Sequence, residues 1–217
     1  MKYWEYILSI PKSFFFCVKC LPLSNAVQLP IIVRYNVVVK SVGEIKLCGS
    51  GFGHVRIGFG EVGIFDKNKE RTIWDSRGDV VFRGKGWIGM GSRIVVGDKA
   101  RLLLGENFVC TASMSLICFK AITIGKETLI SWGTMIMDTD FHHIYHDEVR
   151  KSSEKAIHIG NHVWIGCRSI ILKGTEIKDD CVIAAGSVVV NYFKENNVLI
   201  AGNPASIRKI DVSWTEH

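Results

Sequence analysis

IHIGNHVWIGCRSIILKGTEIKDDCVIAAGSVV, residues 157–189, carries a β-branched aliphatic residue at every sixth position. These positions are Ile159, Ile165, Ile171, Ile177, Ile183 and Val189. A second column lies four places after each aliphatic and contains only small or β-branched residues: Val163, Ser169, Thr175, Cys181 and Ser187. An α-helix repeats every 3.6 residues and a half-buried strand every two, so neither explains a period of six.

A six-residue unit can form one short strand and a corner, so three units close a triangular coil and successive coils stack into a parallel solenoid. The aliphatic column then points inward, where each buried Ile or Val contributes about 1.5–3 kcal/mol before conformational entropy is subtracted. The same period recurs upstream at Ile124, Ile130 and Ile136, with weaker coils near Ile88 and Ile94. The pattern therefore predicts an all-β solenoid.

Proline and glycine positions agree with this architecture. Proline is excluded from interior strands because it cannot donate a ladder hydrogen bond, and no proline occurs between residues 31 and 203. Two G-x-G-x-x-G motifs, which begin at Gly58 and Gly84, match the dinucleotide-binding fingerprint. Neither is followed by an amphipathic helix that would complete a βαβ unit, so we interpret both as solenoid corners.

Composition excludes several classes of protein. The chain has 217 residues and a formal net charge of +6, but no block of Lys and Arg that would favour nucleic-acid binding. Its seven cysteines are odd in number and lie mostly among aliphatic residues, which favours free thiols in a reducing, cytoplasmic compartment. The Cys17-x-x-Cys20 pair has no second pair or suitably spaced His, so no zinc site is predicted.

Residues 1–30 form an apolar segment with aromatic side chains. Pro11, Lys12, Lys19 and Pro22 interrupt it well short of the roughly 20 residues that a membrane span needs, and no small-residue cleavage site follows. We expect a short helix packed on the body of the protein, and favour this over contact with a membrane surface.

The six-residue register stops after Ile136 and resumes at residues 157–159. The intervening residues, about 138–156, should leave the coil as an extended loop, which begins with MDTDFHHIYHDE at 137–148. The predicted organisation is an N-terminal segment at 1–30, a β-helix at 31–190 with this loop extruded from it, and a C-terminal extension at 191–217.

From Ile124 to Ile210 the chain resembles the hexapeptide-repeat acyltransferases. The resemblance is to the branch with galactoside, maltose and antibiotic O-acetyltransferases and the acetyltransferases of surface-polysaccharide gene clusters. The stretch quoted above carries it, together with ITIGKETLISWGTMIMDTDFH (122–142) and AGNPASIRKI (201–210). The resemblance implies a left-handed parallel β-helix, a homotrimer with active sites between subunits, and acetyl-CoA as donor without a metal.

The resemblance also assigns the general base to the first histidine of the extruded loop. This is His142, with His143 as the alternative. Imidazole has an ordinary pKa near 6.5, so it can accept the proton of a sugar hydroxyl at neutral pH. The hydroxyl would then attack the thioester directly, while a backbone N–H stabilises the oxyanion. Asp138 and Asp140 could orient the ring or bind the acceptor, or could simply be solvated.

The family's CoA-contacting positions correspond here to Trp164, Cys167, Ala185 and Arg208. A small residue at Ala185 permits close approach of the pantetheine arm, and Arg208 offers charge to the nucleotide phosphates. Trp164 could equally pack against the wall of the coil. Val190 and Asn191 occupy places where relatives often have Thr-Lys or Thr-Arg, so Lys194 could supply that contact instead. Lys173 and Lys209 are weaker candidates for CoA contacts.

The sequence therefore predicts an acetyl-CoA-dependent O-acetyltransferase that acts on a sugar hydroxyl of a surface polysaccharide or its precursor. A sugar-nucleotide N-acetyltransferase or a xenobiotic acetyltransferase is the alternative within the class. From other classes, a γ-type zinc carbonic anhydrase and a non-catalytic β-helix scaffold stay open. The first would need histidines that converge on zinc at about 2.0–2.1 Å, and the candidates are His142, His143, His146, His158 and His162.

Overall fold

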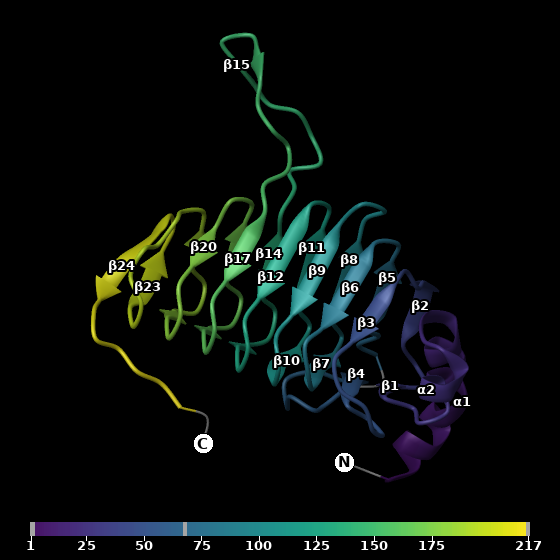
Figure 1. The fold of residues 1–217 in the computed structure, drawn as a ribbon. Helices are drawn as coiled ribbons and strands as arrows, with labels where there is room; N and C mark the ends of the chain where they lie inside the picture. Colours follow the sequence, from purple (N-terminus) through teal and green to yellow (C-terminus); the bar gives the residue numbers. More distant parts are fainter. Residues whose placement is uncertain (1–2, 67–68, 216–217) are drawn as a thin grey trace.

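The structure, a computed structural model, describes residues 3–66 and 69–215. Its strands wind into a three-sided solenoid that is closed at one end by two helices, α1 (Tyr3–Cys20) and α2 (Leu23–Ala26) (Figure 1). Each turn of the chain adds one strand to each of three parallel sheets, which we call A, B and C. An arm leaves the side of the solenoid and carries the antiparallel strands β15 (Tyr145–His146) and β16 (Val149–Arg150).

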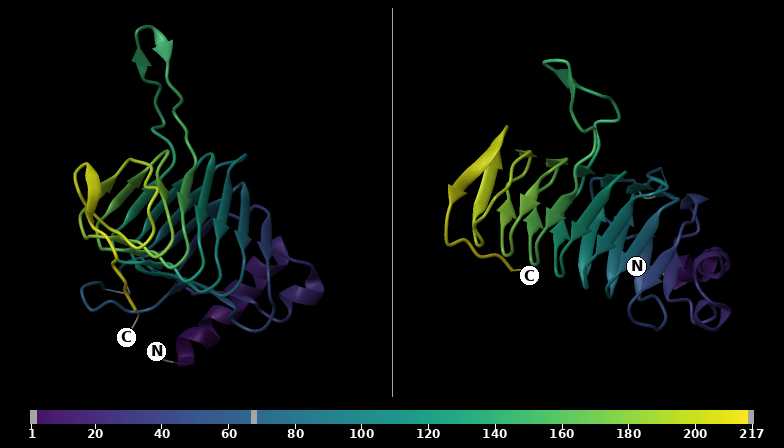
Figure 2. Two further views of the ribbon diagram at one scale, coloured as in Figure 1. Left: turned by 60° about the vertical axis from the view of Figure 1, so that its left-hand side comes forward. Right: turned by 45° about the horizontal axis from the view of Figure 1, so that its top comes forward.

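The strands of each sheet follow one another along the solenoid axis (Figure 2). Sheet A contains β1 (Ile31–Val33), β4 (Val55–Phe59), β7 (Gly86–Met90), β10 (Phe108–Ala112), β13 (Leu129–Ile130), β18 (Trp164–Ile165), β21 (Val182–Ile183), β23 (Leu199–Gly202) and β24 (Ala205–Lys209). Sheet B contains β2 (Val38–Ser41), β5 (Ile73–Ser76), β8 (Arg93–Val96), β11 (Ser115–Cys118), β14 (Met135–Met137), β19 (Ile170–Leu172) and β22 (Val188–Val189). Sheet C contains β3 (Ile45–Leu47), β6 (Asp79–Phe82), β9 (Arg101–Leu104), β12 (Ala121–Ile124), β17 (Ile157–Ile159) and β20 (Glu176–Ile177).

The six-residue period is confirmed: each six-residue unit forms one side of the coil, and three units complete one turn. Ile165 pairs with Ile183 in sheet A, and Ile171 pairs with Val189 in sheet B. Every member of the aliphatic column from Ile159 to Val189 is buried. The small column turns the corners, since the buried hydroxyl of Ser169 donates to the carbonyl of Gly166 at 2.8 Å. Small polar residues at these positions satisfy corner carbonyls that no strand reaches.

The N-terminal coils are filled by aromatic side chains instead. Trp74 and Phe82 are fully buried with stacked rings whose centroids lie 6.5 Å apart, and Phe16 of α1 meets Trp74 edge-on at 5.7 Å. The strands of these coils run to four or five residues, as in β4 and β7. Longer strands and larger interior residues explain why the six-residue pattern is weak before Ile124. The interpretation of the two glycine motifs as corners is wrong for Gly58, which lies in β4, and for Gly86 and Gly89, which lie in β7. Among the described residues, no helix follows either motif.

The coil also continues past residue 190, where the sequence pattern ends. β23 pairs in parallel with β21, and its residue Ile200 is fully buried. The antiparallel strand β24 then closes this end of sheet A. The parallel pairing of sheet A therefore extends to β23, beyond the end of the six-residue pattern.

Helix α1 packs on the open end of the solenoid, as expected, but with its polar side inward. The backbone N–H of Val33 donates to the hydroxyl of Ser13 at 2.9 Å, and that of Tyr35 donates to the hydroxyl of Ser9 at 3.0 Å. Glu5 forms a buried ion pair with Arg34 at 3.1 Å. These contacts satisfy the edge strand β1 and the segment after it, which would otherwise present unpaired backbone groups. Within the described residues, no helix is long and apolar enough to cross a membrane.

Candidate active site

The arm is anchored to the solenoid by Asp138. This residue is fully buried, and its carboxylate accepts backbone N–H bonds from Phe119 at 2.7 Å and from Lys120 and Ala121 at 2.8 Å. A carboxylate that is fully buried and held by three backbone N–H groups is not accessible to a ligand from outside. The acceptor contact predicted for Asp138 does not fit this geometry, and Asp138 instead ties the root of the arm to the preceding corner.

Lys173 holds the two sides of the arm root together. Its ammonium pairs with the half-buried carboxylate of Asp140 and donates to the carbonyl of Ser152 at 2.7 Å. Asp140 precedes the hairpin of β15 and β16, and Ser152 follows it. The side chain of Lys173 therefore joins the two sides of the arm root. Lys173, predicted only as a weak CoA candidate, therefore contacts the arm.

The histidines of the arm differ in their contacts. His142 and His143 are both exposed, and the Nε2 atom of His143 lies 2.7 Å from the guanidinium of Arg150. Arg is a donor only, so the Nε2 lone pair of His143 is engaged. His146 lies 3.0 Å from the carboxylate of Asp147 in an exposed ion pair. Among the described residues, none hydrogen-bonds the ring of His142, which leaves this imidazole available to accept a proton.

An aromatic wall lines the outer surface of sheet A near its C-terminal end. Trp164 is 38% exposed, and its indole N–H donates to the hydroxyl of Ser131 at 3.1 Å. Trp214 stacks on the ring of His162 at 4.3 Å and lies 6.1 Å from Trp164. Asp180 accepts at 2.8 Å from the Nδ1 side of His162. Trp214 was missed by sequence analysis because it lies in the tail, where no repeat indicates its position.

Three of the predicted CoA contacts follow one another along the corner between sheets A and B. Cys167 and Ala185 occupy this corner on consecutive coils, since the N–H of Gly186 donates to the carbonyl of Cys167 at 2.9 Å. On the next coil, Arg208 of β24 donates to the carbonyl of Ala201 at 3.2 Å. Ala185 and Arg208 are exposed. The three side chains thus mark a path along the solenoid axis beside the aromatic wall.

Val190 and Asn191 do not join this path. They lie at the corner between sheets B and C, where the carbonyl of Asn191 accepts from the N–H of Glu176 at 3.3 Å. The arm leaves the solenoid at that same corner, two coils earlier, between β14 and β17. Within one chain, sheet B therefore separates the root of the arm from Cys167 and Ala185. We call the path marked by Cys167, Ala185 and Arg208 the CoA path. In a single subunit, His142 and the CoA path therefore do not lie on the same side of the solenoid.

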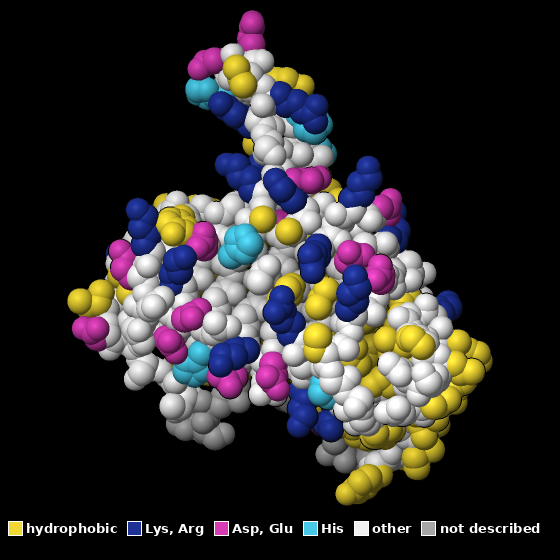
Figure 3. All heavy atoms as spheres, in the orientation of Figure 1, with side chains coloured by type: hydrophobic (Ala, Val, Ile, Leu, Met, Phe, Trp, Pro, Cys, Tyr) yellow, Lys and Arg dark blue, Asp and Glu magenta, His cyan; other side chains and the backbone are white. Residues whose placement is uncertain are grey.

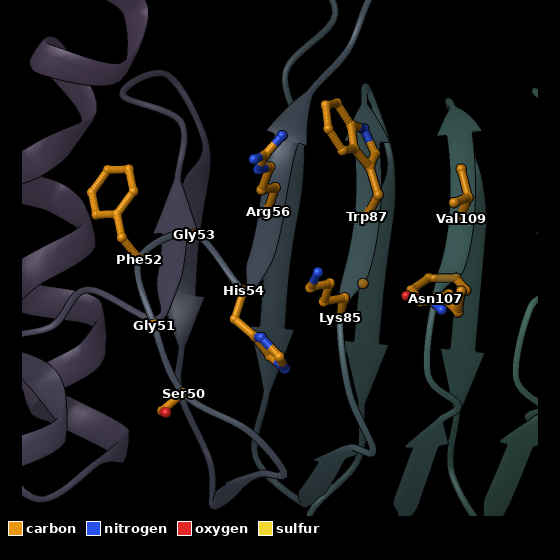
Figure 4. A pocket seen from close by; sticks show the side chains of 12 residues that line it. Ser50, Gly51, Phe52, Gly53, His54, Arg56, Lys85, Trp87, Asn107 and Val109 are labelled. Carbon is orange, nitrogen blue, oxygen red and sulfur yellow. The ribbon is translucent and has the colours of Figure 1, made fainter.

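A cavity of about 490 Å³ lies on the outer surface of sheet A, toward the N-terminal end (Figure 4). The side chains that line it include those of His54, Arg56, Lys85 and Trp87. The guanidinium of Arg56 lies 5.2 Å from the ring of Trp87, and none of the described residues that line the cavity is acidic. Cations beside an aromatic face suit an anionic group on a ring-shaped ligand.

This cavity adjoins a second cavity of about 400 Å³, lined by Asn107, Glu127, His162 and Trp214. Both are lined by Asn107. One surface therefore runs from the basic residues to the aromatic wall. No local sequence pattern indicates this surface, because residues of separate coils contribute to it.

The histidines considered for a zinc site are dispersed. His143 contacts Arg150, His146 contacts Asp147, and His162 contacts Asp180 and Trp214. Across residues 3–66 and 69–215, no three His, Cys, Asp or Glu side chains are grouped so as to hold a metal ion. All seven cysteines are free.

Comparison with known proteins agrees with the coil and corner geometry. Residues 156–191 match the family model of the bacterial transferase hexapeptide (six repeats). The chain is 31% identical over 184 residues to an uncharacterized 24.8 kDa protein in the cps region of Klebsiella pneumoniae, which covers 85% of this chain and 81% of that protein. The chain belongs to the hexapeptide-repeat acyltransferases. The expected family is thus confirmed.

Among these hexapeptide-repeat acyltransferases, the polysialic acid O-acetyltransferase of Neisseria meningitidis is 42% identical over 95 residues, which are 43% of this chain and 44% of that enzyme. The galactoside O-acetyltransferase of Escherichia coli (strain K12) is matched over about half of its length. The crystal structure of the polySia specific acetyltransferase NeuO has the same fold, with a TM-score of 0.61 and 22% identity over 86% of this chain and 82% of that one.

Proposed function

We propose that the protein transfers an acetyl group from acetyl-CoA to a sugar hydroxyl of a surface polysaccharide or its precursor. Membership of the hexapeptide-repeat acyltransferases supports the reaction class, and the likeness to a polysialic acid O-acetyltransferase supports a glycan acceptor. The observation that carries the proposal is the unengaged His142 on an arm rooted by Asp138 and Lys173. The seven free thiols suit a cytoplasmic location.

His142 acts as the general base. Its imidazole takes the proton of the acceptor hydroxyl while the hydroxyl oxygen attacks the thioester carbonyl carbon. A backbone N–H stabilises the oxyanion of the tetrahedral intermediate. When this intermediate collapses, the carbon–sulfur bond breaks and the imidazolium returns the proton to the CoA thiolate. His143 is less suited to the role because Arg150 engages its Nε2 atom.

The active site is completed by a neighbouring subunit of a homotrimer with left-handed coils. The arm of one subunit brings His142 to the corner path of the next, where Trp164, Cys167 and Ala185 flank the pantetheine arm of CoA. Arg208 binds the nucleotide phosphates as a donor-only, always charged group. The separation of the arm root from this path by sheet B within one chain supports a shared site.

The acceptor carries a negative charge. Arg56, Lys85 and His54 line the 490 Å³ cavity without an acidic partner among its lining residues, and Trp87 offers a ring on which a sugar can stack. The cavity adjoins the aromatic wall through Asn107. An acidic glycan could therefore extend from the basic cavity toward the reacting hydroxyl.

The test is thiol release from acetyl-CoA in the presence of acidic glycans, lipid-linked glycans, nucleotide sugars with hydroxyl or amine acceptors, and neutral galactosides. We expect acidic glycans to be acetylated on oxygen, with a KM that rises in Lys85→Gln. Preferred acetylation of an amine, or a KM for acidic glycans that is unchanged in Lys85→Gln, would contradict the proposed acceptor.

The assignment of the base predicts that His142→Ala lowers kcat by roughly two to four orders of magnitude, the usual contribution of general base catalysis. The oligomer should remain intact because the side chain is exposed. His146→Ala, a matched exposed histidine on the same arm, should keep most of the activity. If His143→Ala abolishes turnover and His142→Ala does not, the base is the second histidine.

A further inference from the structure

Helix α1 has its polar and apolar sides reversed with respect to an ordinary surface helix. Its inward side carries Glu5, Ser9 and Ser13, all buried and hydrogen-bonded, together with Phe16 and Cys17. Because the end of the solenoid offers backbone groups to be paired, this side of the helix is polar. Most of the large hydrophobic residues of α1, apart from Phe16, are therefore left on the outside.

The outer side of α1 is a continuous apolar surface. Ile7 and Phe15 are 66% and 67% exposed. At 3.6 residues per turn, the exposed apolar positions cover an arc of about 160° along the whole helix. They are Tyr3, Trp4, Ile7, Leu8, Ile10, Phe14, Phe15 and Val18, and Leu23 and Val27 extend the surface around α2. We call these ten residues the apolar face. Figure 3 shows hydrophobic side chains gathered over this end of the molecule.

The charges around the apolar face are of one sign. Glu5 is the only acidic residue between positions 3 and 27, and it is buried against Arg34. Lys19 is exposed at the edge of the face and lines a groove of about 260 Å³ with Lys12, Phe15 and Phe16. The ammonium of Lys12 is held by the carbonyls of Tyr35 and Val37. Lys19 has no such partner among the described residues, and so is left to meet an anion from outside.

We propose that the apolar face lies in the plane of a membrane that contains anionic lipids. Large aromatic and aliphatic residues on one side of a helix, bordered by Lys, are the features of an interfacial helix. A contiguous apolar surface of this extent marks an interaction site in a protein that is otherwise well packed. The exclusively positive border complements acidic headgroups.

The membrane-facing helix also contacts the basic cavity on sheet A. The ring of Tyr6 lies 5.8 Å from the guanidinium of Arg56 and stacks on Phe59 at 4.8 Å. Docking of α1 would therefore hold the entrance of this cavity near the membrane, where a lipid-linked glycan would be presented. This last consequence rests on the proposed function, whereas membrane binding itself does not.

The experiment is flotation of the full-length protein with vesicles of pure phosphatidylcholine, and with vesicles of phosphatidylcholine and phosphatidylglycerol in equal parts. The wild type should float with the anionic vesicles, and added salt should weaken its binding. Ile7→Ser with Phe15→Ser should weaken partition by at least roughly tenfold, because two large side chains lose their burial in lipid. Lys19→Gln should weaken it by roughly fivefold on anionic vesicles only.

The matched control is Val149→Ser with Ile210→Ser, which removes two equally exposed apolar residues from the arm and from the opposite end of the solenoid. This control should float like the wild type. Failure of the wild type to bind anionic vesicles overturns the proposal, and so does equal binding by the Ile7/Phe15 variant. If that variant instead forms a smaller oligomer in lipid-free buffer, the face is a protein interface. Acetyl transfer to a soluble glycan is measured separately, so loss of membrane binding and failure of the proposed function are distinguishable.

Discussion

Asp138 and His142 are four positions apart in the chain and have opposite surroundings. The carboxylate of Asp138 is buried and accepts three backbone N–H bonds, whereas the imidazole of His142 is exposed and unengaged. The first residue fixes where the arm begins, and the second is free to react. At the residue scale, the D-x-D-F-H stretch thus combines an anchor with the proposed base.

Replacement of Asp138 by Ala should lower the free energy of unfolding by about 3 kcal/mol. It leaves three buried N–H groups without an acceptor, and each hydrogen bond to a charged group contributes roughly 1.5–3 kcal/mol before the structure relaxes. Urea unfolding measures the effect. Asp147→Ala, on the exposed tip of the same arm, is the control and should change stability by less than about 0.5 kcal/mol. An equal effect in both variants would contradict the anchoring role.

At the scale of elements, α1 acts as the cap of the solenoid. A stack of coils exposes an unpaired edge at each end, and capping elements are required to cover it. Here Ser9 and Ser13 accept backbone N–H bonds from the segment that begins with β1. Helix α1 therefore substitutes for a preceding coil, with hydroxyl groups in place of strand carbonyls.

Ser13→Ala should destabilise the protein by about 1–3 kcal/mol, because it leaves the buried N–H of Val33 without its acceptor. The exposed Ser24, whose hydroxyl donates to the side-chain oxygen of Asn25 at 3.3 Å, provides the control, and Ser24→Ala should be close to neutral. Thermal unfolding at equal protein concentration distinguishes the two. Identical midpoints for both variants would show that α1 does not cap the coil through this bond.

The coils from Ile124 to Val189 could be predicted from sequence because one aliphatic residue per side fills their interior. The earlier coils carry a weaker pattern, because Trp74, Phe82 and Phe108 fill wider turns whose strands are longer. The arm was predictable as a break in the register. The burial of Asp138 was not, since it depends on a corner 17 to 19 residues earlier in the chain.

The polar inner side of α1 was equally hidden from sequence. Whether Ser9 and Ser13 face solvent or a sheet edge depends on what the first coil leaves unpaired. The basic cavity combines residues of β4 and β7 that are about 30 positions apart, so no local pattern joins them. Composition did predict free thiols, because the cysteines lie among aliphatic residues.

For the whole molecule, the buried thiols of the solenoid and of helix α1 should make stability sensitive to alkaline pH. Burial raises the pKa of the Cys110 thiol to about 11 and that of Cys20 to about 12, from an ordinary value of 9.0. Burial also raises the pKa of Cys17 and Cys181. Between about pH 9 and 11 the unfolded chain loses these protons while the folded chain keeps them, so stability falls as pH rises.

Urea unfolding from pH 7 to pH 11 tests this dependence. Above pH 9, the free energy of unfolding of Cys110→Ala should fall less steeply with pH than that of the wild type. The difference in slope should be up to about 1.4 kcal/mol per pH unit for the single thiol. Below about pH 8 both states keep the thiol proton, so the two curves should run parallel there. Parallel curves over the whole range would contradict the dry environment of Cys110.

At the scale of the whole molecule, we propose that one subunit supplies His142 and its neighbour supplies the CoA path. Co-expression of two differently tagged variants, His142→Ala and Ala185→Trp, tests it most directly. Each variant alone should be inactive, the first without the base and the second with the pantetheine path blocked. A mixed trimer keeps one intact site, so acetyl transfer should return to about one third of the wild-type rate. Mixed trimers that form but remain inactive would contradict a site shared between subunits.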